Sequence, residues 1–198
     1  GVYQRRDPNN LWEKVVYEAF NIPLQNFISC PILPSSRSIC FTRDAWRIAG
    51  GYPEHVSKAG EDTLFNSLLI AKGFHIEIVP TAVVKWENER TLGELIRKSV
   101  AYGRGDGETR AVDNLYRKML LRFVLGATLL IWSFAAKSVV PVFALFAFNV
   151  FVVFRRVRGK GRTGSKVALV PLIVFAHDIA EVAKLFGYWD GRLRRIFH

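Results

Sequence analysis

The stretch of sequence that decides how this chain is interpreted is AGEDTLFNSLLIAKGF, residues 59–74. Apolar residues recur along it at helical spacing: Leu64, Phe65, Leu68, Leu69 and Ala71. Gly73 stands where such a helix is expected to end. Two adjacent carboxylates, Glu61 and Asp62, open the helix in a chain whose formal net charge is +11. They either cap the helix or supply a catalytic base, and the surrounding sequence has to decide between these functions.

The residues on either side predict short helices and strands in alternation. Residues 9–20 place apolar side chains on one helical face behind an asparagine, and residues 21–38 contain three prolines and predict a loop. Ile39 and Phe41 alternate with polar neighbours, and residues 74–86 are rich in β-branched residues. We therefore expect short strands at both places.

The basic residues gather at the edges of apolar runs, which indicates a membrane and not a nucleic acid as the partner. Residues 119–154 carry only two charged side chains. Because about 20 residues cross the hydrocarbon layer, this run predicts two spans, 119–136 and 138–154, joined by a tight turn at Lys137. The alternative is one long tilted helix with a kink at Pro141.

Two further segments complete the pattern. Residues 91–112 begin with a capping box, Thr91 to Glu94, and predict a basic amphipathic helix at the headgroup boundary. Residues 167–189 start as a third apolar run, but their second half carries charged side chains. The sequence favours a span here and leaves an interfacial position open.

The succession of motifs over residues 35–91 resembles the C-terminal half of a membrane-bound family 2 glycosyltransferase. The stretch SSRSICFTRDAWRIAGGYPEHVSKAGEDTLFNSLLIAKGFHIEIVPTAVVKWENERT carries F-x-R, GG-[FY]-x-E, ED-x-x-[LF], G-x-x-I and P-x-A-x-V in that order. Each motif is unspecific by itself, and the resemblance depends on their order and spacing. It covers about residues 30–110, whereas the membrane tail agrees only in kind.

This resemblance implies the fold class α/β, with a partial GT-A (Rossmann-like) domain followed by α-helical transmembrane segments. It implies an inverting enzyme that transfers a sugar from a nucleotide-sugar to a membrane-proximal, saccharide or lipid-linked acceptor. In that reaction a carboxylate deprotonates the acceptor hydroxyl, a role that falls on Asp62, with Glu61 as a supporting ligand or cap. A divalent metal, Mg or Mn, neutralises the leaving diphosphate, with ligands expected mostly outside this chain.

Five further positions are candidates for substrate binding. Gly50 and Gly51 match a family loop beside the donor sugar and the acceptor, although turn chemistry with positive φ explains them equally well. Arg97, Tyr102 and Arg104 lie where processive relatives carry Gln-x-x-Arg-Trp on an interfacial helix. They would stack on the acceptor sugar and pair with the diphosphate, or else bind lipid headgroups. Absence of the motif argues against a processive polymerase.

The chain also departs from the family pattern. Trp86 stands near the position at which many relatives have a histidine of the metal or diphosphate site, so no metal ligand is assigned within the chain. The sequence contains neither a glycine-bounded first strand nor an Asp-x-Asp, and it begins with Gly1. We therefore expect a truncated or split enzyme whose nucleotide-binding N-terminal half is supplied in cis or in trans. The isolated fragment is expected to be inactive.

The expected organisation has three parts: the acceptor-side part of the catalytic domain over 1–90, the interfacial helix and loop over 91–112, and membrane helices over 113–198. The protein would be a multi-pass protein of the cell membrane with its catalytic part on the cytoplasmic side. Two other functions stay open. One is a non-catalytic, membrane-anchored interaction subunit that needs a partner chain. The other is a small polytopic membrane protein in which the two acids at 61 and 62 only cap a helix.

Overall fold

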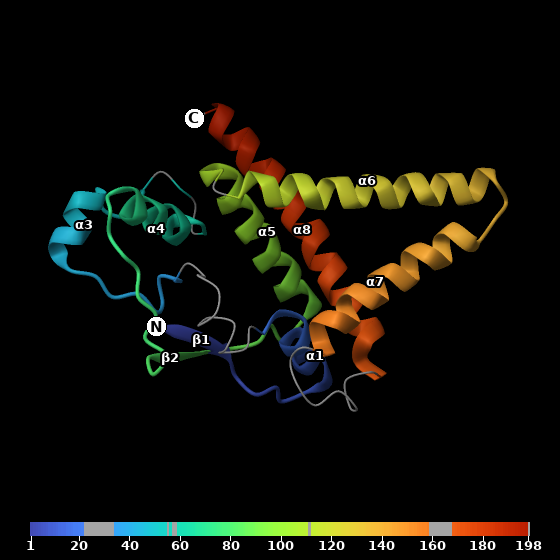
Figure 1. The fold of residues 1–198 in the computed structure, drawn as a ribbon, viewed down its shortest axis with the longest axis horizontal. Coiled ribbons are helices and arrows are strands. Elements are labelled where there is room, and N and C mark those ends of the chain that lie inside the picture. The colour runs from blue at the N-terminus through green and yellow to red at the C-terminus, as the bar shows by residue number, and fades with distance from the viewer. Residues whose placement is uncertain (22–33, 55, 57–58, 111, 159–167, 198) are drawn as a thin grey trace.

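The computed structural model describes residues 1–21, 34–54, 56, 59–110, 112–158 and 168–197. These residues form a mostly helical structure with two short strands (Figure 1). In chain order the elements are β1 (Val2–Arg5), α1 (Leu11–Phe20), α3 (Arg43–Ala49), α4 (Glu61–Ala71), β2 (Val83–Trp86), α5 (Leu92–Thr109), α6 (Asp113–Ala135), α7 (Val140–Arg158) and α8 (Val170–Phe197).

The expected α/β fold class is wrong. β1 and β2 pair in parallel, with Val2 opposite Val83, and form a sheet of two strands. Within the described ranges there is no Rossmann-like domain. β2 lies within residues 74–86, where a strand was expected, whereas the segments around Ile39 and Ile76 form no strand. A strand is stable only when a neighbour completes its hydrogen bonds, and alternation alone does not supply that neighbour.

α5 and α8 cross side by side at the centre of the molecule (Figure 1). Glycines spaced four residues apart lie in their contact: Gly103 and Gly107 on α5, Gly187 and Gly191 on α8. A Cβ on Gly103 would collide with the carbonyl oxygen of Lys184, and a Cβ on Gly187 with that of Val100. The two helices therefore meet backbone to backbone, as small residues at this spacing allow.

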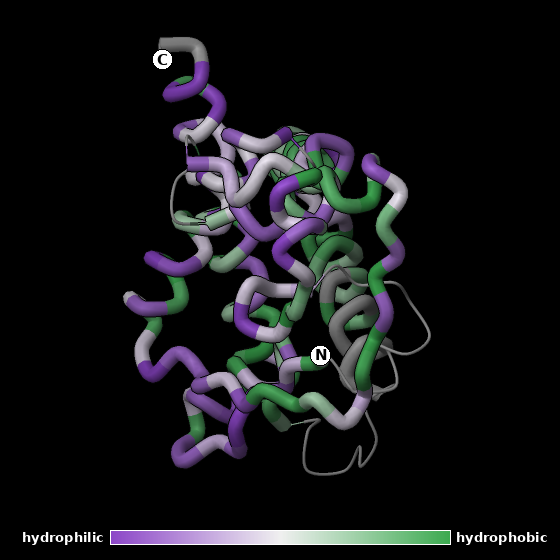
Figure 2. Tube along the Cα trace, turned by 90° about the vertical axis from the view of Figure 1, so that its left-hand side faces the viewer, coloured by the Kyte–Doolittle hydropathy of each residue, from purple (hydrophilic) through white to green (hydrophobic). Residues whose placement is uncertain are grey.

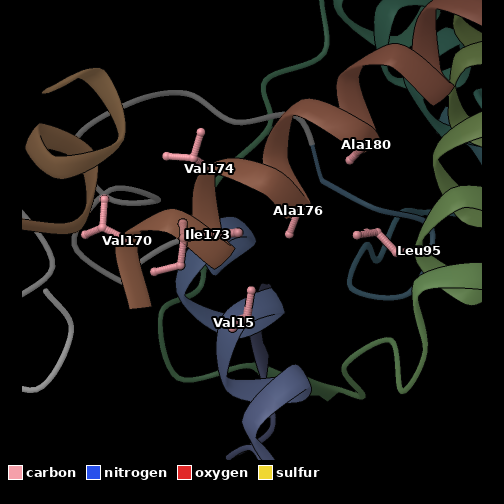
Figure 3. Packing of buried hydrophobic residues seen from close by; sticks show 8 residues of the cluster. Val15, Leu95, Val170, Ile173, Val174, Ala176 and Ala180 are labelled. Atoms are coloured by element: carbon pink, nitrogen blue, oxygen red, sulfur yellow. The ribbon is translucent and has the colours of Figure 1, made fainter. Parts of the chain in front are cut away.

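Apolar side chains fasten α1 to this helix pair (Figure 3). The buried members of the cluster come from α1, α5 and α8: Val15, Ala19, Leu95, Val170, Ile173, Val174, Ala176 and Ala180. A second cluster packs α3 on α4 through Ala45, Ala49, Phe65 and Leu69. Each large side chain buried in this way stabilises the fold by about 1.5–3 kcal/mol.

α6 and α7 form a hairpin that projects to the right in Figure 1, on the other side of α5 and α8 from α3 and α4. The chain turns at residues 136–139, where Lys137 has a φ of 49°. The chain therefore forms two helices here and not one kinked helix. Pro141 lies in the first turn of α7, where its missing N–H breaks no intrahelical bond. In the described part of the chain, one helix, α6, is long and apolar enough to cross a membrane.

The third apolar run forms α8, which changes character along its length. Ile173 and Ala176 in its first turns are buried in the core. Its C-terminal end is hydrophilic (Figure 2) and carries Asp190, Arg194 and Arg195. α8 therefore joins the apolar base of the hairpin to the polar side of the molecule.

Candidate functional site

Asp62 lines a cavity of about 410 Å³ that lies between β1, β2, α4, α5 and α8. The side chains that give the cavity its chemistry are Arg37, Glu61, Asp62, Trp86, Lys98 and Tyr102. Three of these were expected from the sequence: Glu61, Asp62 and Tyr102. Segments that are far apart in the sequence therefore meet at one place.

A close backbone contact positions the start of α4. Gly60 is the N-cap residue, with a φ of 98° and no side-chain cap. A Cβ added to Gly60 would lie 2.9 Å from the carbonyl carbon of Gly105, so this loop rests directly on α5. Positive φ and close approach both require glycine here. As a result Glu61 and Asp62 form the first turn of α4 beside the cavity-facing side of α5.

The Asp62 carboxylate is held by two backbone amides. Thr63 N–H donates to Oδ1 at 2.8 Å, and Ser36 N–H donates to Oδ2 at 3.3 Å. An ionised carboxylate offers about four lone-pair sites, so acceptor capacity is left for a ligand hydroxyl. Oε2 of Glu61 is buried without a hydrogen-bond partner among the described residues. Asp62 is not the N-cap residue of α4, since Gly60 occupies that position, and its carboxylate accepts from a first-turn amide while it lines the cavity.

Two cations lie against the Trp86 ring. Cζ of Arg37 is 3.4 Å and Nζ of Lys98 is 4.6 Å from its centroid. Lys98 Nζ also lies 5.8 Å from the centroid of Tyr102. Burial raises the pKa of the Tyr102 hydroxyl, and the nearby Arg37 guanidinium partly opposes this. Cation–π contacts of this kind, at about 0.5–2 kcal/mol each, fix both cations at the cavity wall.

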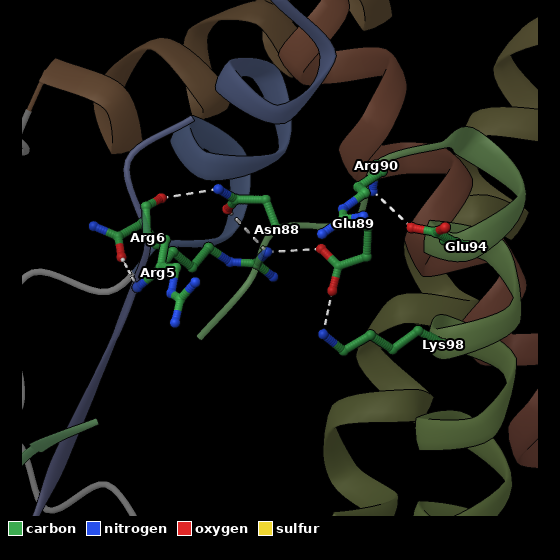
Figure 4. A network of polar contacts seen from close by, with 8 residues as sticks. Arg5, Arg6, Asn88, Glu89, Arg90, Glu94 and Lys98 are labelled. Atoms are coloured by element: carbon green, nitrogen blue, oxygen red, sulfur yellow. Dashed lines mark hydrogen bonds and ion pairs between the residues drawn. The ribbon is translucent and has the colours of Figure 1, made fainter. Parts of the chain in front are cut away.

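A buried carboxylate, Glu89, pairs with two of the cations that line the cavity, Arg5 and Lys98 (Figure 4). The Glu89 side chain is 5% exposed and pairs with Arg5 at 2.7 Å and with Lys98. Burial opposes its charged form, but Arg5 and Lys98 outweigh burial and lower the pKa of Glu89. Burial lowers the pKa of Lys98, and Glu89 partly offsets this. Arg5 Nη1 also donates to Asn88 Oδ1 at 3.4 Å, which ties β1 to the segment after β2.

Positive groups outnumber carboxylates around the cavity. The cations are Arg5, Arg37, Lys98 and Lys184, and the carboxylates are Glu61, Asp62 and Asp106. Arg5 and Lys98 are already paired with Glu89, whereas Arg37 and Lys184 form no ion pair with a described carboxylate. Burial raises the pKa of Asp106, although the Tyr116 hydroxyl donates to it at 2.6 Å. Because Glu89 pairs with Arg5 and Lys98, Arg37 and Lys184 are the lining cations left to meet an anionic group of a ligand.

The other candidate residues from the sequence do not line this cavity. Gly50 and Gly51 have φ values of 87° and 76°, and Gly50 forms the C-cap of α3. Nε of Arg104 pairs with Asp190 of α8 at 2.6 Å. Arg97 lies on α5 outside the lining. Their positions agree with the turn and structural explanations of these residues.

Lys98 and Asp106 are cavity residues that the sequence reasoning missed. Together with Tyr102 they are spaced by four along α5 and therefore lie on one face. Once Tyr102 was assigned to the site, the four-residue spacing could have identified Lys98 and Asp106 as its neighbours on the same helix face. Arg37 was not assigned to the site, and Trp86 was noted only as a departure from the family pattern. No periodicity connects either residue to α5, because both come from distant segments.

The described residues do not fit a divalent metal beside Asp62. The one described group of His, Cys, Asp or Glu that is compact enough consists of His177, Asp178 and Glu181 on α8, and none of them lines the cavity. Arg122 of α6 pairs with Asp178 at 3.3 Å and with Glu181, so a cation of the protein already contacts both carboxylates of that group. No chemical step is therefore derived through a metal.

Comparison of the chain with protein-family models, with curated proteins and with solved structures finds no match. The resemblance to family 2 glycosyltransferases stays a prediction from the sequence. Function has to be argued from the chemistry of the cavity.

Proposed function

We propose that this chain is the acceptor-side part of a membrane-bound, inverting glycosyltransferase of the family 2 type, with Asp62 as the general base. One observation carries the proposal: Asp62 lies in a cavity, fixed by two backbone amides, beside the cations Arg37 and Lys184. A base needs a fixed position with lone pairs to spare, and a departing diphosphate needs positive charge.

In this reaction the acceptor hydroxyl oxygen attacks the anomeric carbon of the sugar while its proton passes to Asp62. The bond from that carbon to the diphosphate oxygen breaks, and the nucleoside diphosphate leaves from the opposite face, which inverts the configuration. Arg37 and Lys184 stabilise the negative charge on the leaving group. Tyr102, which is 36% exposed, offers an aromatic face for the acceptor sugar. The nucleotide is bound by a further polypeptide segment, in cis or in trans.

The apolar hairpin supports a membrane location for this activity. We place α6 and α7 across the cell membrane in a multi-pass protein, with the cavity on the cytoplasmic side, where nucleotide-sugars are made. Arg117 and Lys118 are exposed at the base of the hairpin, and one basic residue, Lys137, lies at its tip. The larger number of basic residues at the base than at the tip agrees with the positive-inside rule, which places the base on the cytoplasmic side. A membrane-proximal or lipid-linked acceptor follows, because α5 contributes to the cavity and leads directly into α6.

Sugar transfer by membranes that contain the chain joined to its natural upstream sequence tests the proposal. Radiolabelled nucleotide-sugars are supplied, and label in lipid and polysaccharide is counted. Asp62→Asn should reduce transfer by about 10²- to 10⁴-fold. The control Asp44→Asn changes a carboxylate on α3 that is 82% exposed, and it should keep the rate within about twofold. No transfer by the parent protein, or equal rates for both variants, would overturn the proposal.

A second function, the non-catalytic interaction subunit, is supported by an apolar cavity of about 380 Å³ on the α3–α4 side. Ile39, Phe41, Leu69 and Ile76 line it, and Phe41 is 36% exposed. A partner chain would bury these side chains. Co-purification of a nucleotide-binding chain that Ile76→Asp abolishes, without any sugar transfer, would favour this function over the enzyme.

A further inference from the structure

A second apolar cavity lies between α6 and α7, with Asp178 of α8 at one end. Its volume is about 610 Å³, within the range of about 300–1,000 Å³ that small-molecule ligands occupy. The proposed sugar transfer makes no use of it. None of the residues that line it lines the cavity of Asp62.

Small residues hold this space open. Gly126 and Ala127 of α6 and Ala144 of α7 line it, and Leu125, Leu130 and Phe148 complete the walls. A Cβ on Gly126 would lie 3.6 Å from Leu145, an ordinary contact, so no backbone crowding requires glycine there. The walls offer water almost no hydrogen-bond partners, and an apolar ligand is favoured over solvent.

The exposed side chains around the cavity indicate whether a ligand enters from water or from the hydrocarbon of a bilayer. On the outer faces of the hairpin Ile131 is 71%, Phe134 is 89% and Phe143 is 67% exposed. Exposed apolar surface of this extent belongs in hydrocarbon and not in water. The molecules that reach the cavity are therefore lipid chains.

A compact ionic cluster closes one end of the cavity. Arg122 and Asp178 are lining residues, and Arg122 pairs with Asp178 at 3.3 Å and with Glu181. His177 lies 3.7 Å from Asp178 and 3.4 Å from Glu181. Two carboxylates, Asp178 and Glu181, face the one guanidinium of Arg122, so the cluster offers no unpaired cation to an anionic headgroup. The carboxylates can still accept a hydrogen bond from a hydroxyl.

We propose that this cavity binds the hydrocarbon chain of an uncharged lipid alcohol, with the hydroxyl at the Arg122–Asp178 end. The chain fills the apolar walls, and the hydroxyl meets the one polar end of the site. The proposal needs the hairpin in a bilayer, but it does not depend on sugar transfer by the Asp62 cavity.

Photolabelling of the purified full chain in phosphatidylcholine nanodiscs tests this site. The probe is a long-chain alcohol with a diazirine near the middle of its chain, and adducts are located by mass spectrometry of peptides. Adducts should favour the lining residues over the outward positions Phe134 and Phe143. The lining residues of the two helices at the middle of the site are Leu125, Gly126, Ala127, Leu129, Leu130, Ala144, Leu145 and Phe148. Equal labelling of inward and outward faces would show bulk lipid contact only and overturn the proposal.

Two alanines of α7 give a matched pair of variants. Both are exposed, but Ala144 lines the cavity and Ala147 does not. Ala144→Leu should reduce labelling of α6 by about tenfold, which corresponds to about 1.4 kcal/mol of lost affinity. Ala147→Leu adds the same atoms and should leave labelling unchanged. Equal effects of the two substitutions would contradict a site in the cavity.

A competition experiment tests the charge of the headgroup. An unlabelled alcohol of the same chain length should displace the probe at least about tenfold more strongly than the corresponding alkyl phosphate. Equal competition, or stronger competition by the phosphate, would contradict the assignment of an uncharged polar end.

Discussion

At the scale of single residues, Glu89 is the side chain on which the cation arrangement at the Asp62 cavity depends. It pairs with Arg5 and Lys98 while its own side chain is 5% exposed. Removing its charge leaves two partly buried cations without a partner, which costs far more than the loss of a surface ion pair. Lys98 would then lose its fixed position beside Trp86.

We therefore expect Glu89→Gln to lower the free energy of unfolding by about 3–5 kcal/mol. Thermal unfolding in detergent measures the effect. The control is Glu87→Gln, a carboxylate that is 58% exposed and pairs with Arg6 and Arg90; it should cost no more than about 1 kcal/mol. Similar losses for both variants would contradict the buried network.

The pH dependence of this effect has a defined sign. The pKa of Glu89 is lowered in the folded protein below its ordinary value of 4.5. The pair therefore contributes its full stabilisation above pH 4.5 and loses it as the pH falls through the folded-state pKa. The difference in melting temperature between parent and Glu89→Gln should stay constant down to pH 4.5. It should shrink as the pH falls through the folded-state pKa of Glu89. A difference that grows in acid would refute the ion-pair explanation.

At the scale of elements, the contact between α5 and α8 is the feature that orders the molecule. The sequence already contains its signal, because Gly103 and Gly107 on one helix and Gly187 and Gly191 on the other are four residues apart. The sequence analysis missed it, since spacing alone does not say which two helices meet. Capping chemistry was easier to predict: Thr91 accepts from Glu94 N–H at 3.1 Å, and Asn10 caps α1.

Gly103→Ala should destabilise the fold by about 1–3 kcal/mol or more, because the added methyl group meets the backbone of α8. Gly93→Ala is the matched control on the same helix, where a Cβ would meet only Thr91 Oγ1 at 3.9 Å. This substitution should stabilise the protein by about 0.5–1 kcal/mol through helix propensity. Melting curves of both variants give the comparison. Equal effects would mean that the helices do not touch through backbone.

The strands were predicted only in part: β2 lies within residues 74–86, where a strand was expected, whereas β1 was not expected. Alternation around Ile39 and Ile76 satisfied the β pattern, but neither segment forms a strand. Pairing partners are set by tertiary structure, and a local pattern cannot reveal whether they are present. The wrong α/β fold class came from the resemblance to the glycosyltransferase family, which implied a Rossmann-like sheet that the described residues do not form. α4 was predicted correctly, because helical hydrogen bonds are local and the 3.6-residue period is sufficient.

At the scale of the whole molecule, the hairpin determines where the cavity lies relative to a membrane. The sequence predicted the break near Lys137 and left open whether residues 167–189 cross the bilayer. The sequence also assigned Glu61, Asp62 and Tyr102 to the site, but it did not assign Arg37, Trp86 or Lys184. Those residues come from separate segments that only the folded chain brings together.

Cysteine labelling tests the placement of the hairpin. Lys137→Cys, in a background with Cys30→Ser and Cys40→Ser, should react with a membrane-impermeant maleimide added to intact cells. Cys40, which is exposed and lies outside the hairpin, should react in a Cys30→Ser background only after the cells are opened. Reaction of both residues from the same side would mean that the hairpin lies on the membrane and does not cross it.

The single-turnover rate of sugar transfer by Asp62→Asn, measured at saturating donor and acceptor together with acceptor affinity, tests the central claim most directly. The complete membrane-bound enzyme is used, and the melting temperature of each variant is checked. The rate should fall by about 10²- to 10⁴-fold, while the Kd for the acceptor changes by less than about threefold. A rate equal to that of Asp44→Asn, or a loss confined to acceptor binding, would show that Asp62 is not the base.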